Sequence, residues 1–419
     1  MTPIDGSVLE ENKIGFFGCL SYILGNCIGA GIFIAPSAVT ENVGSVGLSI
    51  AVWILCGLIS LLGSIVYIEL GTGILEPGCD YAYICYVGWN SVAFAFMWVG
   101  VILSYPASTA VQILTFGHYI IDGMSQNIHF GQTLQSFIEW NLGIIVLVFV
   151  TWINFYSLNK SAVIFQIAST VAKLCATALI IVAGLYCFFF KGMNENFIKP
   201  FEYSQFNIRD FVFSINAGFY AYSGWDVLNY SSNEIRNPSR NMPSSLLLGI
   251  SLVILLYTLM IFSYFVALTP QEVLKTNAIA ALFSQKVFGP FYYVVPFMIA
   301  VLICGSLNSN LFCSSRYVFC KMKKNEILPL FSFKYYMLAA ARERHLPKFL
   351  SCINEETGSP RAAIAAQLLL TVLLSFINVN RLIDYVAFVM VLQKVAGIAA
   401  LLWIRFKKIP VNASNTLLY

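Results

Sequence analysis

Charged residues divide this chain into long stretches in which Asp, Glu, Lys and Arg are absent. A membrane-spanning helix requires roughly 20 residues, and seven charge-free stretches approach or exceed that length: residues 14–40, 42–68, 81–121, 140–159, 241–270, 287–315 and 362–380. Three more carry one interior charge each: residues 161–190, 211–233 and 385–404. The chain is 58% hydrophobic and 11% charged, a composition typical of integral membrane proteins. We predict an all-α membrane fold with about ten spans.

The distribution of basic residues predicts the orientation in the membrane. With the N-terminus in the cytoplasm, sixteen of the 24 Lys and Arg fall on the inner side and six on the outer side, as the positive-inside rule requires. Residues 1–13 lack the basic start and the cleavage site of a secretory signal. We expect residues 1–13 to be a cytoplasmic N-terminus, residues 14–406 a transmembrane domain, and residues 407–419 a cytoplasmic tail.

The first and sixth spans are interrupted near their middle. Residues 25–36 contain three glycines and end on a proline, and residues 216–226 mix glycine, serine and aromatic residues. Backbone groups lose their partners where a spanning helix breaks, so a break persists where it lines a cavity. The two spans hold corresponding positions in two halves of five, which predicts a five-plus-five inverted-repeat transporter core with discontinuous helices 1 and 6. Close helix packing at Gly25 and Gly29, four residues apart, is the alternative interpretation.

The helix ends at these breaks indicate what the cavity binds. A helix that begins near residues 31–33 directs N–H groups and a positive dipole end at the cavity, which suits a carboxylate. Half-helices that end at Cys27 and near Tyr220 direct free carbonyl groups there, which suit an ammonium. One zwitterion satisfies both sets, so the sequence favours an α-amino acid. Tyr220 and Trp225 are candidates for closing over it, although most single aromatic residues in such a chain face lipid.

Lys173 lies near the middle of the fifth span, with twelve uncharged residues before it and seventeen after it. An unpartnered ammonium at that depth costs about 2.5 to 3.5 kcal/mol. We interpret Lys173 as a structural and coupling residue that anchors a helix and supplies a positive charge in place of a sodium ion. A purely structural lysine satisfied by carbonyls is the alternative. Glu69, Asp226 and Lys394 are weaker candidates, and Glu69 and Lys394 fit plain interfacial positions.

The sequence carries no signature of catalysis, metal binding or nucleic-acid binding. His118, His129 and His345 are scattered, and no phosphate-binding loop, Gly-x-Ser-x-Gly motif or Cys-x-x-Cys pair occurs. No patch combines basic and aromatic residues. We therefore expect no cofactor, no metal, no catalytic residue and no nucleic-acid partner. The expected partners are the lipid bilayer and a small zwitterionic substrate.

Short motifs spread over nearly the whole chain carry a family resemblance. They are residues 29–33, 69–71, 80–84, 172–174, 222–225, 229–230, 234–238, 305–308, 314–316 and 341–348. Together they resemble the L-type amino-acid transporter family, the light-chain branch of the amino acid, polyamine and organocation superfamily. The resemblance implies the five-plus-five inverted-repeat fold, sodium-independent exchange of amino acids and a plasma-membrane location.

The resemblance also implies a substrate site at the two breaks. The family's site for the substrate backbone corresponds to Ile28, Gly29, Ala30, Gly31 and Ile32, with further residues at Tyr220, Ala221, Ser223 and Gly224. The family's aromatic gate falls on Tyr220. Relatives that carry dibasic amino acids have an aspartate where this chain has Ser223, which cannot neutralise a cationic side chain. This favours neutral substrates, although Asp226 lies one turn away where relatives often have asparagine.

The chain departs from the family pattern in three places. The outer segment 117–139 has no cysteine, where heavy-chain-linked members have one for a disulfide, so a single-span glycoprotein heavy chain is expected to bind noncovalently if at all. About nineteen extra residues, 317–335, form an expected cytoplasmic insertion or a retained intron. The sequence ends soon after Lys408, and against the twelve spans that the resemblance implies we expect the family's last two helices to be absent.

These observations predict a sodium-independent exchanger of neutral L-amino acids that works by alternating access. A proton- or ion-coupled amino-acid symporter is one alternative. A truncated, transport-inactive member of the family that acts only in assembly is the other. A membrane enzyme has the least support, because no acid, base or metal set gathers at one depth.

Overall fold

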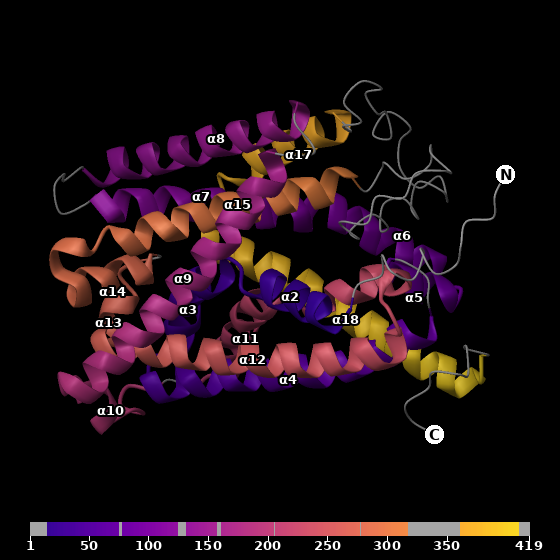
Figure 1. The fold of residues 1–419 in the computed structure, drawn as a ribbon, viewed down its shortest axis with the longest axis horizontal. Helices are drawn as coiled ribbons and strands as arrows, with labels where there is room; N and C mark the ends of the chain where they lie inside the picture. Colours follow the sequence, from indigo (N-terminus) through magenta and orange to yellow (C-terminus); the bar gives the residue numbers. More distant parts are fainter. Residues whose placement is uncertain are drawn as a thin grey trace.

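The computed structural model describes residues 15–74, 78–124, 131–156, 161–204, 206–276, 278–316 and 361–409, and its regular elements are helices (Figure 1). The α-helices are α2 (Phe16–Cys27), α3 (Gly31–Val43), α4 (Val46–Gly73), α5 (Asp80–Tyr86), α6 (Asn90–Val99), α7 (Tyr105–Met124), α8 (Gln132–Tyr156), α9 (Ser161–Phe190), α10 (Glu195–Ile198), α11 (Ile208–Tyr222), α12 (Pro238–Ala267), α13 (Pro270–Val273), α14 (Ile279–Phe288), α15 (Val294–Arg316), α17 (Arg361–Leu374) and α18 (Val379–Lys407). A π-helical turn, η1 (Gly100–Ser104), and two 3₁₀ segments, η2 (Trp225–Glu234) and η3 (Gly289–Phe291), complete them.

The apolar runs of the sequence coincide with these helices. Among the described residues, six helices are long and apolar enough to span a membrane, and α2 with α3 makes a seventh candidate when counted as one bent span. The six are Val46–Gly73, Asn90–Met124, Thr133–Ile153, Val171–Phe190, Pro238–Ala267 and Val379–Lys407. The remaining expected runs hold α15, whose apolar part Val294–Asn308 is shorter than these spans, the short helix α17, and α11 followed by η2. The prediction of an all-α membrane protein is confirmed, because long apolar runs satisfy their backbone groups only as helices.

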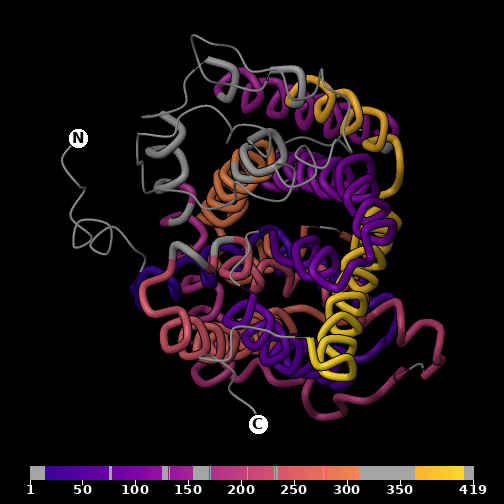
Figure 2. The backbone as a smooth tube through the Cα atoms, turned by 90° about the vertical axis from the view of Figure 1, so that its right-hand side faces the viewer, coloured from indigo at the N-terminus to yellow at the C-terminus, as the bar shows by residue number. Residues whose placement is uncertain are grey.

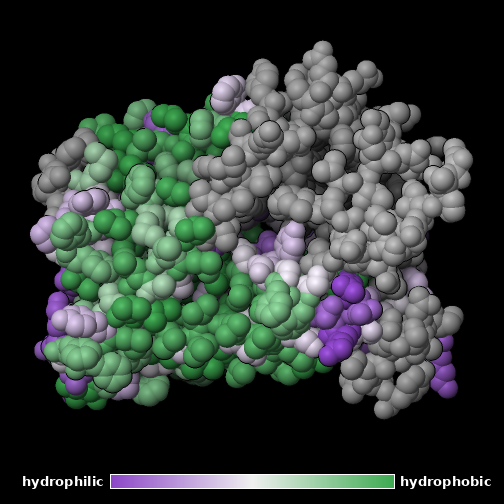
Figure 3. Space-filling view, in the orientation of Figure 1, coloured by the Kyte–Doolittle hydropathy of each residue, from purple (hydrophilic) through white to green (hydrophobic). Residues whose placement is uncertain are grey.

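Large apolar side chains cover much of the outer surface. Leu62, Val182, Phe189, Phe190 and Phe297 are each more than 60% exposed. Figure 3 shows a mainly apolar face, with hydrophilic residues gathered towards its two ends. A soluble protein would bury such a surface, so these side chains face lipid.

The spans form two packed groups. In the first, which we call the broken-helix group, α12 packs along α4 and α2, and α11 packs along α3. In the second, the scaffold group, α15 packs along α7 and α9, and α8 packs along α7. Helix α18 contacts α11 of the first group and α7 of the second, and Figure 2 shows it in yellow passing along one side of the molecule between them. The site described below lies where the groups face each other.

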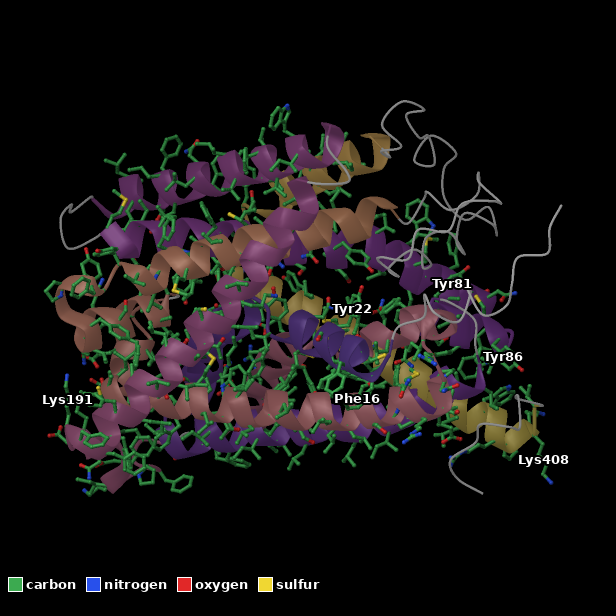
Figure 4. The ribbon with its side chains drawn as sticks, in the orientation of Figure 1. Phe16, Tyr22, Tyr81, Tyr86, Lys191 and Lys408 are labelled. Carbon is green, nitrogen blue, oxygen red and sulfur yellow. The ribbon has the colours of Figure 1, made fainter. Side chains whose placement is uncertain are left out.

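The two ends of the molecule carry different segments. Figure 4 places Lys191, after α9, at one end, and Lys408, after α18, at the other. Tyr86 of α5 lies at the same end as Lys408. This is the end that the basic-residue distribution assigns to the cytoplasm. The expected N-terminal segment 1–13, the insertion at about 317–335 and most of the tail lie outside the described residues.

Candidate functional site

The first span is broken between α2 and α3. Helix α2 ends at Cys27, α3 begins at Gly31, and the two halves are bent by 48°. Ala30 precedes α3 without a side-chain hydrogen bond to cap it. The first N–H groups of a helix have no partners within that helix, so this end of α3 retains the donors and the positive dipole end that favour an anion.

The sixth span is broken at the corresponding place. Helix α11 ends at Tyr222, and the chain turns through Gly224, whose φ of 99° is left-handed, into η2. Glycine suits this position because a side chain there would be strained. The Ser223 hydroxyl donates to the Tyr220 carbonyl at 2.8 Å.

The two breaks lie against each other. A Cβ added to Gly31 would lie 2.7 Å from the Ala221 Cα, and one added to Gly224 would lie 3.1 Å from the Asn26 carbonyl oxygen. Gly31 and Gly224 therefore allow backbone to approach backbone. The alternative of close helix packing at Gly25 and Gly29 is wrong, because a Cβ added to Gly25 would meet no atom within 4 Å and one added to Gly29 would meet only the carbonyls of Asn26 and Cys27. The cavity interpretation holds at this place, because Gly29, Gly31 and Gly224 line a cavity.

That cavity has a volume of about 640 Å³. Of the expected substrate-site residues, Gly29, Ala30, Gly31, Tyr220, Ala221, Ser223 and Gly224 line it. Ile28 and Ile32 are fully buried and do not line it. Trp225 lines it too, with its ring centroid 5.1 Å from that of Tyr67. The structure thus brings together the two breaks and the expected aromatic gate, Tyr220, around one volume.

Tyr257 of α12 joins the breaks and was not singled out in the sequence. Its hydroxyl lies 2.5 Å from the carbonyl oxygen of Cys27 and 3.1 Å from that of Ala221. The Cys27 carbonyl also accepts from the Gly29 N–H at 2.7 Å. The expectation of free carbonyls at Cys27 and Tyr220 is therefore wrong, because nearby hydroxyl and N–H groups already bond to both. Nothing in the charge-free run around Tyr257 distinguished it from other buried tyrosines.

Lys173 of α9 lies in the cavity wall and is 4% exposed. Its Nζ donates to the Gly25 carbonyl at 2.8 Å, in the last turn of α2. This contact ties the scaffold group to the broken-helix group next to the break. It also places a positive charge among the backbone groups of the site.

A buried ion cluster lies in the same cavity wall. The Lys394 Nζ is 2.5 Å from an Asp226 oxygen and 2.9 Å from an Asp80 oxygen. The ammonium also lies 4.5 Å from the ring centroid of Tyr67 and 5.3 Å from that of Trp225. The interfacial position expected for Lys394 is therefore wrong, because its partners come from segments too distant in sequence to be paired by pattern. Glu69, by contrast, pairs at 2.6 Å with Arg405, in the last turn of α18.

The cluster also contains the best candidate for a metal site in the described part of the chain. One ligand atom each of Cys79, Asp80 and Asp226 lies within 4.8 Å of the others. Lys394 already supplies a cation to both carboxylates. The negative charge of these carboxylates is thus already balanced in part by Lys394, without a metal ion.

Comparisons with known proteins agree with this architecture. The model of the amino acid permease family matches residues 14–413. Amino acid transporter protein 6 of Caenorhabditis elegans is 39% identical over 402 residues, which are 96% of this chain and 73% of that protein. Asc-type amino acid transporter 1 of Mus musculus is 33% identical over 406 residues, covering 96% of this chain and 72% of the relative. The human cystine/glutamate transporter is also 33% identical over 406 residues, with 97% and 76% covered.

The helical membrane fold, the two broken spans and the match over nearly the whole chain lead to one assignment. The chain belongs to the amino acid permease family.

Proposed function

We propose that this protein transports neutral L-amino acids across a membrane as a sodium-independent exchanger. The observation that carries the proposal is the meeting of two broken spans at one cavity, where the uncapped start of α3 faces the backbone of the α11–η2 break. The names of its relatives, which are amino-acid transporters, support the same class of substrate.

The substrate carboxylate would bind the backbone N–H groups at Ala30 and Gly31, next to the positive dipole end of α3. The Gly29 N–H already donates to the Cys27 carbonyl, so Gly29 would contribute the open backbone beside them. The ammonium would bind at the opposite break, where it competes with the Ser223 hydroxyl for the Tyr220 carbonyl. Ile28 and Ile32 would contribute backbone only, since their side chains are buried away from the cavity.

Transport would proceed by movement of the broken-helix group against the scaffold group, which exposes the cavity to each side in turn. Tyr220 would act as the gate, because it lines the cavity and is 5% exposed. Lys173 would couple the groups through Gly25 and supply a positive charge in place of a sodium ion.

The cellular setting is part of the proposal. We place both termini in the cytoplasm, on the distribution of basic residues. The plasma-membrane location is proposed on the resemblance to the L-type amino-acid transporter family. Any association with a single-span glycoprotein heavy chain would be noncovalent, because segment 117–139 contains no cysteine.

The test is uptake of labelled amino acids into proteoliposomes that contain only this protein. We expect uptake when the vesicles are preloaded with an unlabelled neutral amino acid, little uptake into empty vesicles, and no change when sodium is replaced by choline. Uptake into empty vesicles driven by a proton or sodium gradient would instead establish a symporter. Absence of uptake under all these conditions would contradict transport by this chain.

Substitution of Tyr257 by phenylalanine is expected to weaken substrate binding about two- to tenfold, because one net hydrogen bond is worth about 0.5–1.5 kcal/mol. The lost hydroxyl bonds to a carbonyl of each break, so the breaks would no longer be held in one geometry. The measurement is the half-saturating substrate concentration in proteoliposomes.

Tyr264→Phe is the matched control for this variant. Tyr264 is on the same helix and buried, and its hydroxyl has no hydrogen-bond partner among the described residues. The control should retain wild-type affinity. Equal effects of the two substitutions would show that the Tyr257 hydroxyl has no special role at the breaks.

A further inference from the structure

The Lys394 ammonium is held between carboxylates from two different parts of the chain. Asp226 belongs to η2, directly after the second break, and Asp80 begins α5. The Tyr67 hydroxyl donates to Asp80. The side chains of Asp80 and Asp226 are only 4% and 11% exposed, so neither carboxylate is well solvated by water.

The balance of charge in this cluster depends on Lys394. Two ionised carboxylates and one ammonium leave one negative charge, whereas removal of the ammonium leaves two negative charges that face each other. Buried charges of one sign require a counter-charge or a change of protonation. An unoccupied cluster without Lys394 would therefore attract a cation from the cavity.

The cluster lies within reach of a bound substrate. Asp226 follows Gly224 by two residues, and Gly224, Asp226 and Lys394 all line the same cavity. The Lys394 side chain is 26% exposed, although its partners are nearly enclosed. A substrate whose backbone binds at the breaks thus has its side chain close to a carboxylate that Lys394 already neutralises.

We propose that Lys394 is a built-in counter-cation that determines specificity by excluding amino acids with cationic side chains. Its ammonium fills the position that the side-chain ammonium or guanidinium of lysine, ornithine or arginine would occupy beside Asp226. Its charge also repels a second cation. This inference rests on the proposed amino-acid transport and names which side chains that site rejects.

A purely structural role is the competing explanation for the cluster. The contacts of Lys394 with Asp226 and Asp80 join α18 to η2 and α5. Loss of these contacts would lower the stability of the protein, or the transport of every substrate alike. It would not create a new preference. A gain of cationic substrates is therefore the result that separates the two roles.

The test compares three variants of the purified full-length protein in proteoliposomes. Lys394→Gln removes the charge, Lys394→Arg keeps it, and the double variant Lys394→Gln with Asp226→Asn removes the ammonium together with its nearest carboxylate. Competition by L-lysine and L-arginine against a labelled neutral amino acid is measured in choline buffer and in sodium buffer.

We expect L-lysine and L-arginine to compete at least about tenfold more strongly in Lys394→Gln than in the wild type. Lys394→Arg and the double variant should resemble the wild type in this respect. Unchanged selectivity in Lys394→Gln that still transports neutral substrate would overturn the proposal. An equal gain in the double variant would also overturn it, because Asp226 would not be the attracting group. Competition by cations that disappears in sodium buffer would show that the vacated site prefers a metal ion, which also contradicts an amino-acid side-chain subsite.

A binding measurement keeps this inference separate from the proposed function. Thermal unfolding of each variant in detergent is followed with L-lysine, with L-leucine and without ligand, since a ligand that binds the native state stabilises it. Stabilisation of Lys394→Gln by L-lysine, absent in the wild type and in the double variant, supports the inference even if transport fails. Stabilisation by L-leucine alone in every variant leaves amino-acid binding intact and refutes the role of Lys394.

Discussion

Replacement of Gly31 by valine is expected to reduce uptake to less than about a tenth of the wild-type rate, which corresponds to a loss of about 1.4 kcal/mol or more. Even a Cβ at this position would lie 2.7 Å from the Cα of Ala221 and 3.3 Å from its Cβ. Because the nearest atom belongs to the backbone, rotation of a side chain cannot relieve the contact. Helix α3 would have to move away from α11, and the two breaks that form the proposed substrate site would separate.

The overpacking in Gly31→Val also costs stability, of the order of 1–3 kcal/mol. Uptake must therefore be divided by the amount of protein at the cell surface and compared with a matched glycine variant. Gly15→Ala is suitable, because a Cβ there meets no atom within 4 Å and Gly15 only precedes the same broken span. Normal uptake per molecule in Gly31→Val would show that the substrate carboxylate binds somewhere other than the start of α3.

Replacement of Lys173 by methionine is expected to lower uptake at least about tenfold, since a hydrogen bond to a charged group is worth about 1.5–3 kcal/mol. Methionine keeps most of the length of the side chain but removes the donor that lies 2.8 Å from the Gly25 carbonyl. The last turn of α2 would lose its tie to α9, and the cavity would lose a positive charge. The measurement is exchange in proteoliposomes, with and without sodium.

Lys191→Met is the control for Lys173→Met, because Lys191 is exposed beyond the end of α9 and Figure 4 places it at one end of the molecule. Uptake that becomes dependent on sodium in Lys173→Met would support the charge role proposed for this lysine. Lower uptake with no response to sodium would support the anchoring role alone. Wild-type uptake would contradict both roles.

The helices and both breaks were predictable from the sequence because they depend on local properties of the chain. A long apolar run must form a helix in lipid, since no other structure pairs its backbone groups. Glycine and the residues around it mark the places where that helix can end, at residues 28–30 and at 223–224. The seven expected residues that line the proposed substrate site lie at these places or within three residues of them.

The contacts across the cavity were not predictable, and the errors share one cause. Lys394 lies 168 residues from Asp226 and 314 residues from Asp80 in the sequence. Without these partners in view, its long side chain suggested a position within snorkelling reach of the membrane surface. The bond from Tyr257 to Cys27 spans 230 residues. A single sequence does not state which distant polar groups will meet.

The sequence by itself therefore determined the class of the protein, the helical runs, the two interruptions and the family. Only the tertiary structure decided which carbonyls remain available, how closely Gly31 approaches Ala221, and that Lys394 neutralises Asp226 at the cavity. The physical reason is the range of the interactions. Backbone satisfaction in lipid acts within one helix, whereas burial of a charge requires partners that several packed helices bring together.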